Sequence, residues 1–250
     1  MRLNAEKFLA MKGKTLITML TAYTYPVARC LEKAGVPIIL VGDTLGMVEM
    51  GHKSTRPVTV EQMCYHVAAV RRGAPETHVI GDLPYQSDND PDSTLKNSRL
   101  LIEAGADSVK LEGPKTEIIA HLVDNHIDVI GHTGLTPQTA ENFKQVGREK
   151  DDAARIIDES EKIAAAGAFM VVLEHIPAKL AGQITAQLKV PTIGIGAGAA
   201  CDGQVLVIND AIGLGDYWPP FSKQYAYVSQ TVEDVARQFM HEVTERKFPA

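Results

Sequence analysis

Four acidic residues come directly after short apolar runs that lie far apart in the chain: Asp43, Asp82, Glu112 and Glu174. In a parallel barrel the carboxyl ends of all strands open onto one face, where barrel enzymes carry their active sites. Carboxylates gathered there repel one another unless they share protons or a cation. Because oxygen-only ligands suit a hard ion such as Mg²⁺, the acids predict a metal site. The alternative is that they cap helices or pair with Lys and Arg.

Two basic residues accompany these acids. Lys110 precedes Glu112 by two positions on one expected strand, so both side chains point to the same face. Lys110 could hold a substrate carboxylate, or form an internal salt bridge with one of the acids, since buried charges need partners. His132 ends another apolar run and is either a donor or proton carrier for a bound oxo acid, or a structural histidine.

Short apolar runs alternate with helix-period segments along the chain. The expected strands cover residues 16–22, 38–41, 78–83, 108–111, 128–132, 169–173, 191–195 and 205–208. The expected helices cover residues 25–33, 59–73, 93–103, 116–125, 151–166, 178–188 and 231–245. Eight strands separated by helices favour a single-domain (β/α)8 TIM barrel over residues 1–250, with a C-terminal helix, rather than an open doubly wound sheet.

An internal recurrence supports the barrel. Residues 34–43, 104–112 and 166–174 each contain a helix-ending Ala-Gly, then a strand, then an acid. The glycine suits the left-handed position after a helix. The acids therefore occupy equivalent places in a repeated unit, and residues 73–82 follow the same plan more loosely.

Composition excludes several classes of protein. The net charge is −6 and no basic run occurs, which argues against nucleic acid as a partner. Three scattered cysteines, Cys30, Cys64 and Cys201, are too few for a disulfide framework and fit a reducing compartment. We see no signal-peptide pattern and no apolar stretch of about 18 residues. We therefore expect a cytoplasmic protein that acts on small molecules and does not associate with a membrane.

Eight segments of the sequence resemble one known family, ketopantoate hydroxymethyltransferase, of the phosphoenolpyruvate/pyruvate barrel superfamily. They are residues 41–47 (VGDTLGM), 51–55 (GHKST), 57–59 (PVT), 69–75 (AVRRGAP), 82–84 (DLP), 109–113 (VKLEG), 131–138 (GHTGLTPQ) and 194–198 (GIGAG). The match runs from about residue 15 to residue 245. Thr44 stands where family members commonly carry serine, and His175 stands beside Glu174 where Cys or Gly is more usual.

The resemblance implies transfer of a hydroxymethyl group from 5,10-methylenetetrahydrofolate to 3-methyl-2-oxobutanoate through a Mg²⁺-stabilised enolate. The product would be 2-dehydropantoate, on the route to pantothenate and coenzyme A. The resemblance also implies a homo-oligomer, a decamer in this family. The matching residues imply a metal site of Asp43, Asp82 and Glu112, substrate contacts from Asp43, Thr44, Asp82, Lys110 and His132, and Glu174 as the catalytic proton-transfer residue.

Two other functions stay open. The same metal chemistry on the same fold would serve a lyase or mutase that cleaves a 2-oxo or 2-hydroxy acid. A barrel without catalytic activity could act only in assembly, although the intact set of acids argues against it.

Overall fold

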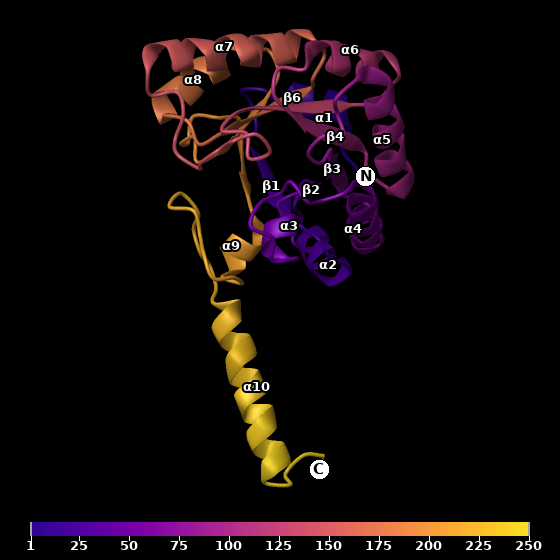
Figure 1. Cartoon of the computed structure of the whole chain (residues 1–250), viewed down its shortest axis with the longest axis vertical. Helices are drawn as coiled ribbons and strands as arrows, with labels where there is room; N and C mark the ends of the chain where they lie inside the picture. The colour runs from indigo at the N-terminus through magenta and orange to yellow at the C-terminus, as the bar shows by residue number, and fades with distance from the viewer. Residues whose placement is uncertain (1, 250) are drawn as a thin grey trace. The chain divides into compact units, whose positions relative to one another are not determined.

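The computed structural model describes residues 2–249, and Figure 1 shows the chain. Within those residues eight strands form a closed barrel in the order β1 to β8, and the pairs from β1–β2 to β7–β8 are parallel. The strands are β1 (Ile17–Thr21), β2 (Ile38–Val41), β3 (His78–Asp82), β4 (Ser108–Glu112), β5 (Val129–Gly134), β6 (Met170–Glu174), β7 (Thr192–Ile195) and β8 (Gly203–Leu206). The expected barrel is confirmed, and the open sheet is wrong.

Helices separate most of the strands, and α5, α6, α7 and α8 lie along the outside of the sheet in Figure 1. The helices are α1 (Ala5–Met11), α2 (Tyr25–Lys33), α3 (Leu45–Val48), α4 (Val60–Gly73), α5 (Pro91–Ala104), α6 (Thr116–Asp124), α7 (Lys150–Ala165), α8 (Ala178–Gln187), α9 (Ile208–Ile212) and α10 (Val228–Thr244). The sequence pattern missed α1, α3 and α9, because segments of seven residues or fewer are too short to show a helical period.

The chain divides into two compact units, one ending at Val205 and the other beginning at Leu206. The first unit holds α1 to α8 and all strands except the last residue of β8, Leu206, and the second holds α9 and α10. The single-domain organisation over residues 1–250 stays a prediction. Among residues 2–249, no helix combines the length and the apolar character that crossing a bilayer requires.

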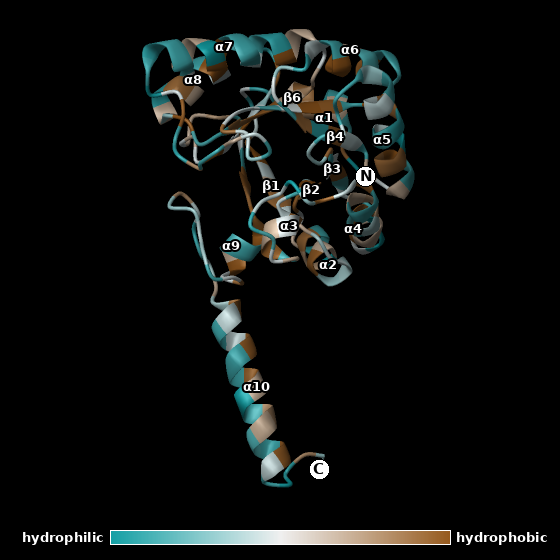
Figure 2. Ribbon diagram, viewed as in Figure 1, coloured by the Kyte–Doolittle hydropathy of each residue, from teal (hydrophilic) through white to brown (hydrophobic). Residues whose placement is uncertain are grey.

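The strands are apolar and the surrounding helices carry polar residues on their outer sides (Figure 2). Alternate residues of each strand face the barrel interior, and Ile80, Ile130 and Val172 belong to its buried core. Two positions further along the same strands come Asp82, His132 and Glu174. Because the side-chain period of a strand is two, these polar residues point to the same interior side. The apolar core therefore ends where the polar site begins.

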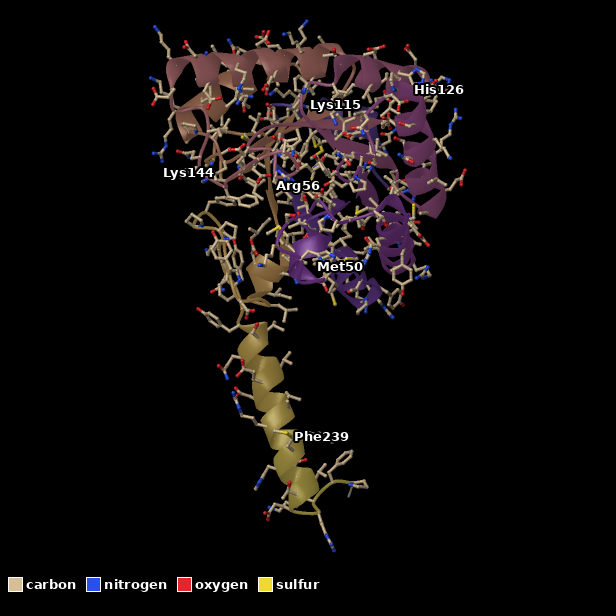
Figure 3. The ribbon with its side chains drawn as sticks, in the orientation of Figure 1. Met50, Arg56, Lys115, His126, Lys144 and Phe239 are labelled. Atoms are coloured by element: carbon tan, nitrogen blue, oxygen red, sulfur yellow. The ribbon has the colours of Figure 1, made fainter. Side chains whose placement is uncertain are left out.

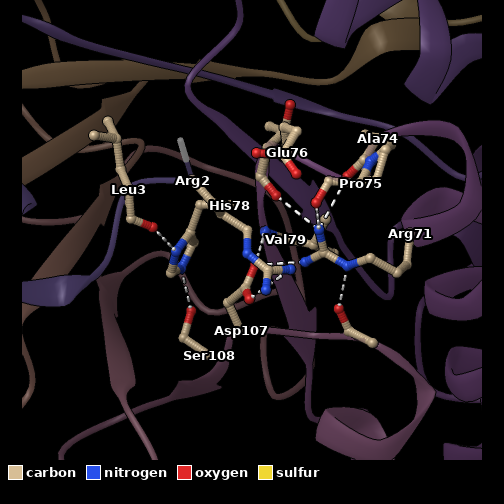
Figure 4. A network of polar contacts seen from close by, with 12 residues as sticks. Arg2, Leu3, Arg71, Ala74, Pro75, Glu76, His78, Val79, Asp107 and Ser108 are labelled. Carbon is tan, nitrogen blue, oxygen red and sulfur yellow. Dashed lines mark hydrogen bonds and ion pairs between the residues drawn. The ribbon is translucent and has the colours of Figure 1, made fainter.

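Helix α1 packs against the buried barrel core with its Phe8 side chain. The ring of Phe8 lies edge-on to His78 at 5.2 Å between centroids, and His78 bridges the carbonyl of Leu3 and the hydroxyl of Ser108 (Figure 4). Burial lowers the pKa of His78, so the neutral imidazole is favoured in this apolar setting.

Arg71, near the end of α4, links several backbone segments in the same region. Its guanidinium donates to the carbonyls of Ala74, Thr77 and Gly105 and pairs with the Asp107 carboxylate (Figure 4). Asp107 in turn accepts from the backbone N–H of Val79 at 2.9 Å. One side chain thus fastens the end of α4 to the beginnings of β3 and β4.

Asp202 joins α1 to the strands β7 and β8. Its carboxylate accepts from Lys12 Nζ at 2.7 Å, from Gly13 N at 3.0 Å and from Thr192 N at 2.9 Å. Burial alone would raise the pKa of Asp202, but the ion pair and the two backbone N–H donors outweigh it and hold the pKa below its usual 3.8. The folded state therefore favours the ionised carboxylate.

We expect Asp202→Asn to lower the free energy of unfolding by about 2 kcal/mol at pH 7. A carboxyl whose pKa is depressed by folding stabilises the protein above its unfolded pKa, and this stabilisation is lost as the pH falls through the folded pKa. Urea unfolding of wild type and variant should therefore differ at pH 7 and converge as the pH falls through the lowered pKa of folded Asp202. Asp158→Asn, in an exposed pair with Lys162, serves as the control and should change little. A wild-type-to-variant difference independent of pH would contradict this account.

Candidate functional site

Strand register brings the acids and bases of the C-terminal barrel face together. Asp82 on β3 lies opposite Lys110 on β4, and Glu112 on β4 lies opposite His132 on β5. Glu174 on β6 pairs with Gly134, two positions after His132 on the same face of β5. Four neighbouring strands thus carry an unbroken row of charged and polar side chains into one site.

Lys110 forms a buried ion pair with Asp82. Its Nζ lies 2.7 and 2.9 Å from the two carboxylate oxygens, and both side chains are almost fully buried. Burial opposes the charge on Lys110, but the carboxylates of Asp82, Glu112 and Asp43 outweigh it and raise the pKa of Lys110. The salt-bridge interpretation of Lys110 is therefore realised with Asp82; its contact with substrate stays a prediction.

Asp43 lies two residues after the end of β2, in the turn that follows Gly42. The alternation of side chains along β2 therefore does not extend to it. Its backbone N–H donates to Asp82 Oδ2 at 3.3 Å. Burial first, and then the charges of Asp82 and Glu112, raise the pKa of Asp43 to about 8. Three carboxylates with one lysine among them leave an excess of negative charge, so the site favours a further proton or a cation.

Gln138 connects two of the acids, a role that the sequence pattern does not indicate. Its side-chain Nε2 donates to Asp43 Oδ2 and to the carbonyl of Leu83, both at 2.9 Å. Its backbone N–H donates to Glu112 Oε2 at 3.1 Å. Gln138 is buried at 2% exposure, so it orients both carboxylates from the loop after β5. The only signal in the sequence was its place at the end of the segment 131–138.

His132 lies between two carboxylates. Its Nδ1 is 3.5 Å from Glu112 Oε1 and its Nε2 is 3.2 Å from Glu174 Oε2. Burial disfavours the imidazolium, but the two carboxylates outweigh it and raise the pKa of His132 to about 9. For Glu112, burial is likewise outweighed by His132, Lys110 and the Gln138 N–H, so its pKa is lowered. At neutral pH the imidazolium form therefore links Glu112 to Glu174.

Glu174 is the more accessible carboxylate of this pair, with a side-chain exposure of 16% against 5% for Glu112. Gly134 makes its position possible: a Cβ on Gly134 would lie 2.4 Å from the Glu174 carbonyl oxygen, and its φ of +97° is left-handed. The backbone N–H of Leu135 also donates a hydrogen bond to the Glu174 carbonyl at 2.9 Å, which joins the ends of β5 and β6. Glu174 is thus held at the mouth of the barrel beside His132.

The loop after β2 contributes Thr44 directly beside Asp43. Thr44 is the N-cap residue of the short helix α3, and its backbone is helical at φ −51° and ψ −22°. Further along the loop, Arg56, labelled in Figure 3, donates to the carbonyls of Gln138 and Ala140 and lies over the Tyr85 ring at 5.5 Å. These contacts fasten the loop after β2 to the loops after β3 and β5.

The donors suit a hard divalent ion by their chemistry, because Asp43, Asp82 and Glu112 offer carboxylate oxygens, and burial together with the neighbouring carboxylates raises the pKa of Asp43. Lys110 contacts the carboxylate of Asp82, and Gln138 contacts that of Asp43. Among residues 2–249, no group of three or more acidic, histidine or cysteine side chains has an arrangement that could hold a metal ion without rearrangement. The metal roles of Asp43, Asp82 and Glu112 remain a prediction, as do the substrate roles of Thr44, Lys110 and His132 and the catalytic role of Glu174.

Comparison with solved structures supports the fold. The structure of phosphonopyruvate hydrolase in complex with oxalate and Mg²⁺ matches with a TM-score of 0.65 at 13% identity, over 97% of this chain and 88% of that one. That of 2,3-dimethylmalate lyase, a PEP mutase/isocitrate lyase superfamily member, matches with a TM-score of 0.63 at 15% identity, over 100% and 90%. At these identities the likeness concerns the fold alone.

Sequence comparison is more specific. Proteins named 3-methyl-2-oxobutanoate hydroxymethyltransferase from Thermus thermophilus and Trichlorobacter lovleyi are 47% and 48% identical to this chain. They cover 100% and 93% of it, and the matches span 98% and 90% of their own lengths. The family model described as ketopantoate hydroxymethyltransferase matches residues 2–250. The chain belongs to the ketopantoate hydroxymethyltransferase family.

Proposed function

We propose that this protein transfers a hydroxymethyl group from 5,10-methylenetetrahydrofolate to 3-methyl-2-oxobutanoate, giving 2-dehydropantoate for pantothenate synthesis. Relatives that match this chain over nearly their whole length are named for that activity. In the structure, the proposal is supported by the row of polar side chains from Asp82 on β3 to Glu174 on β6. This row places a charged lysine beside acids that could bind a metal and beside an accessible carboxylate.

The reaction begins with removal of a proton from C3 of the 2-oxo acid. Glu174 is the base, because it is accessible and His132 holds it by one oxygen at 3.2 Å. The proton moves from C3 to a Glu174 carboxylate oxygen and leaves an enolate. The enolate carbon then bonds to the methylene carbon of the folate donor, and both carbon–nitrogen bonds to that carbon break. Water supplies the hydroxyl group and one proton, Glu174 returns the proton taken from C3, and tetrahydrofolate leaves with both protons.

Other residues bind and orient the substrate. Asp43, Asp82 and Glu112 would hold Mg²⁺, which when bound supplies Lewis-acid polarisation of the keto oxygen. Lys110 and Thr44 contact the substrate carboxylate, and Lys110 keeps its charge through its ion pair with Asp82. His132 and Gln138 keep the carboxylates in place through their hydrogen bonds and ion pairs.

An assay with 3-methyl-2-oxobutanoate and methylenetetrahydrofolate tests this function. We expect consumption of the 2-oxo acid to require the folate donor and Mg²⁺, to stop on addition of EDTA, and to resume when excess Mg²⁺ is restored. Mg²⁺ should also raise the melting temperature, because a ligand that binds only the folded state stabilises it. Loss of the 2-oxo acid without folate would favour a lyase instead, and turnover unchanged by EDTA would remove the metal from the proposal.

The protein is further proposed to act in the cytoplasm as a homo-oligomer, a decamer by resemblance. Helix α10 supports self-association, because its apolar residues are exposed at helical spacing (Figures 2 and 3, where Phe239 is labelled). They are Val232, Val235, Phe239, Met240 and Val243. Such a face usually marks an interaction surface, and a monomer in sedimentation equilibrium would contradict the proposal.

A further inference from the structure

A cleft of about 370 Å³ lies beside the acids of the site and contains an acid of its own. It is lined by Asp88 and Asn89, from the loop between β3 and α5, and by residues 114–118, from the loop after β4 and the start of α6. Both loops follow neighbouring strands at their carboxyl ends, so the cleft opens on the catalytic face. Its volume is within the range of small-molecule sites.

Asp88 is the unusual residue in this cleft. It is buried at 1% exposure, and its Oδ1 lies 2.6 Å from Lys115 Nζ, whose side chain is 33% exposed. Apart from this ion pair and a weak interaction with its own backbone N–H, the carboxylate has no hydrogen-bond donor among residues 2–249. A buried carboxylate is costly without hydrogen-bond donors, so Asp88 is suited to accept from a ligand in the cleft. Burial raises the pKa of Asp88 against the attraction of Lys115, which agrees with this shortage of donors.

The backbone around Asp88 is held in place from both sides. Asn97 on α5 donates to the carbonyl of Ser87 at 2.7 Å, and Ser87 N donates to the carbonyl of Pro84 at 3.0 Å. On the other side, Asp90 caps α5 through Ser93 N at 2.9 Å. The carboxylate is therefore presented by a rigid loop, as a preorganised binding group requires.

The cleft is also close to the proposed reaction centre. Lys115 follows Glu112 by three residues, which span at most about 11 Å of chain. The Glu112 carboxylate lies near enough to contribute to the raised pKa of Asp88. A ligand anchored at Asp88 thus has its far end within reach of the carboxylates.

We propose that Asp88 binds the 2-amino-4-oxopyrimidine edge of the pterin ring in the folate donor, with Lys115 donating to the 4-oxo oxygen. The 2-amino group and N3–H of a pterin are two parallel donors, which match the two acceptor oxygens of a carboxylate. The ammonium beside that carboxylate matches the adjacent carbonyl. This inference rests on the proposed function for its choice of ligand, and it assigns the donor's ring to a cleft separate from the acids that receive the 2-oxo acid.

Binding of 6-methylpterin and 6-methyllumazine to the wild-type protein tests the inference without mutation. Lumazine carries an oxygen in place of the 2-amino group, so it loses one of the two donors. We expect the pterin to bind at least about 10-fold more tightly, since hydrogen bonds to a charged group are the strong ones. Equal affinities for the two compounds would overturn the assignment.

A matched pair of variants then locates the group responsible. Asp88→Asn should raise the dissociation constant of tetrahydrofolate about 10- to 100-fold and abolish the preference for pterin. Asp124→Asn makes the same chemical change at an exposed residue at the end of α6, outside the cleft lining, and should alter neither. Thermal unfolding verifies that both variants are folded. An equal loss in both variants, or none in Asp88→Asn, would refute the role of Asp88.

The failure of this inference and of the proposed function can be told apart. Exchange of the C3 proton of 3-methyl-2-oxobutanoate in deuterated water needs no folate. In the wild-type protein it measures proton removal by the proposed acids of the site, independently of Asp88. Exchange and turnover without a pterin preference would leave the function standing and remove Asp88 from it. Absence of both exchange and folate-dependent turnover would instead remove the function.

Discussion

Replacement of Glu174 by glutamine should slow exchange of the C3 proton of 3-methyl-2-oxobutanoate by about 10²- to 10⁴-fold, the usual contribution of a general base. Glutamine keeps the shape of the side chain but cannot take up the proton. Glutamine also keeps an acceptor oxygen for His132 Nε2, so an uncharged hydrogen bond can replace the 3.2 Å contact between His132 and the Glu174 carboxylate. Deuterium incorporation followed by NMR in D₂O measures the step directly, before any folate chemistry.

The matched control for this variant is Glu161→Gln, which makes the same change at an exposed position of α7. It should exchange the C3 proton at the wild-type rate. The Glu174→Gln variant should still gain thermal stability from Mg²⁺, since Glu174 is not among the proposed metal ligands. Wild-type exchange in Glu174→Gln would mean that another group is the base.

Asp82→Asn should abolish turnover, because Asp82 is both a proposed metal ligand and the partner of Lys110. We expect loss of the stabilisation by Mg²⁺ together with a fall in activity of at least about 10²-fold, comparable to removing a preorganised electrostatic group. Thermal unfolding with and without Mg²⁺, combined with the folate assay, measures both effects. Retention of most of the activity would exclude Asp82 from the metal site.

The same substitution also breaks a buried ion pair. Removing one partner of such a pair typically costs about 3–5 kcal/mol, because the other charge is left uncompensated. The double variant Asp82→Asn/Lys110→Met removes both charges and should recover part of this stability without recovering activity. If restoring stability also restored turnover, the effect of Asp82→Asn would be one of folding rather than of chemistry.

The barrel and the strands that carry the candidate site could be predicted from local patterns in the sequence. Apolar runs separated by helix-period segments predicted all eight strands, although the last was expected at 205–208 and lies at Gly203–Leu206. The bounds of α2 and β2 agree with the expected residues 25–33 and 38–41. These features are local, because a strand or helix of sufficient length shows its period in its own residues. The capping box of α4 at Thr59 and Gln62 is local in the same sense.

Which of these residues contact one another could not be predicted from the sequence, because it depends on the folded arrangement of the strands and loops. Lys110 shares a strand face with Glu112, yet its ammonium pairs with Asp82 across the β3–β4 register. Gln138 reaches Asp43 from 95 residues away. The burial of Asp88 depends on how two loops fold over each other. The spacing of residues in a strand fixes the face of a side chain but not its neighbours, which depend on strand register and on loop conformations set by contacts remote in the chain.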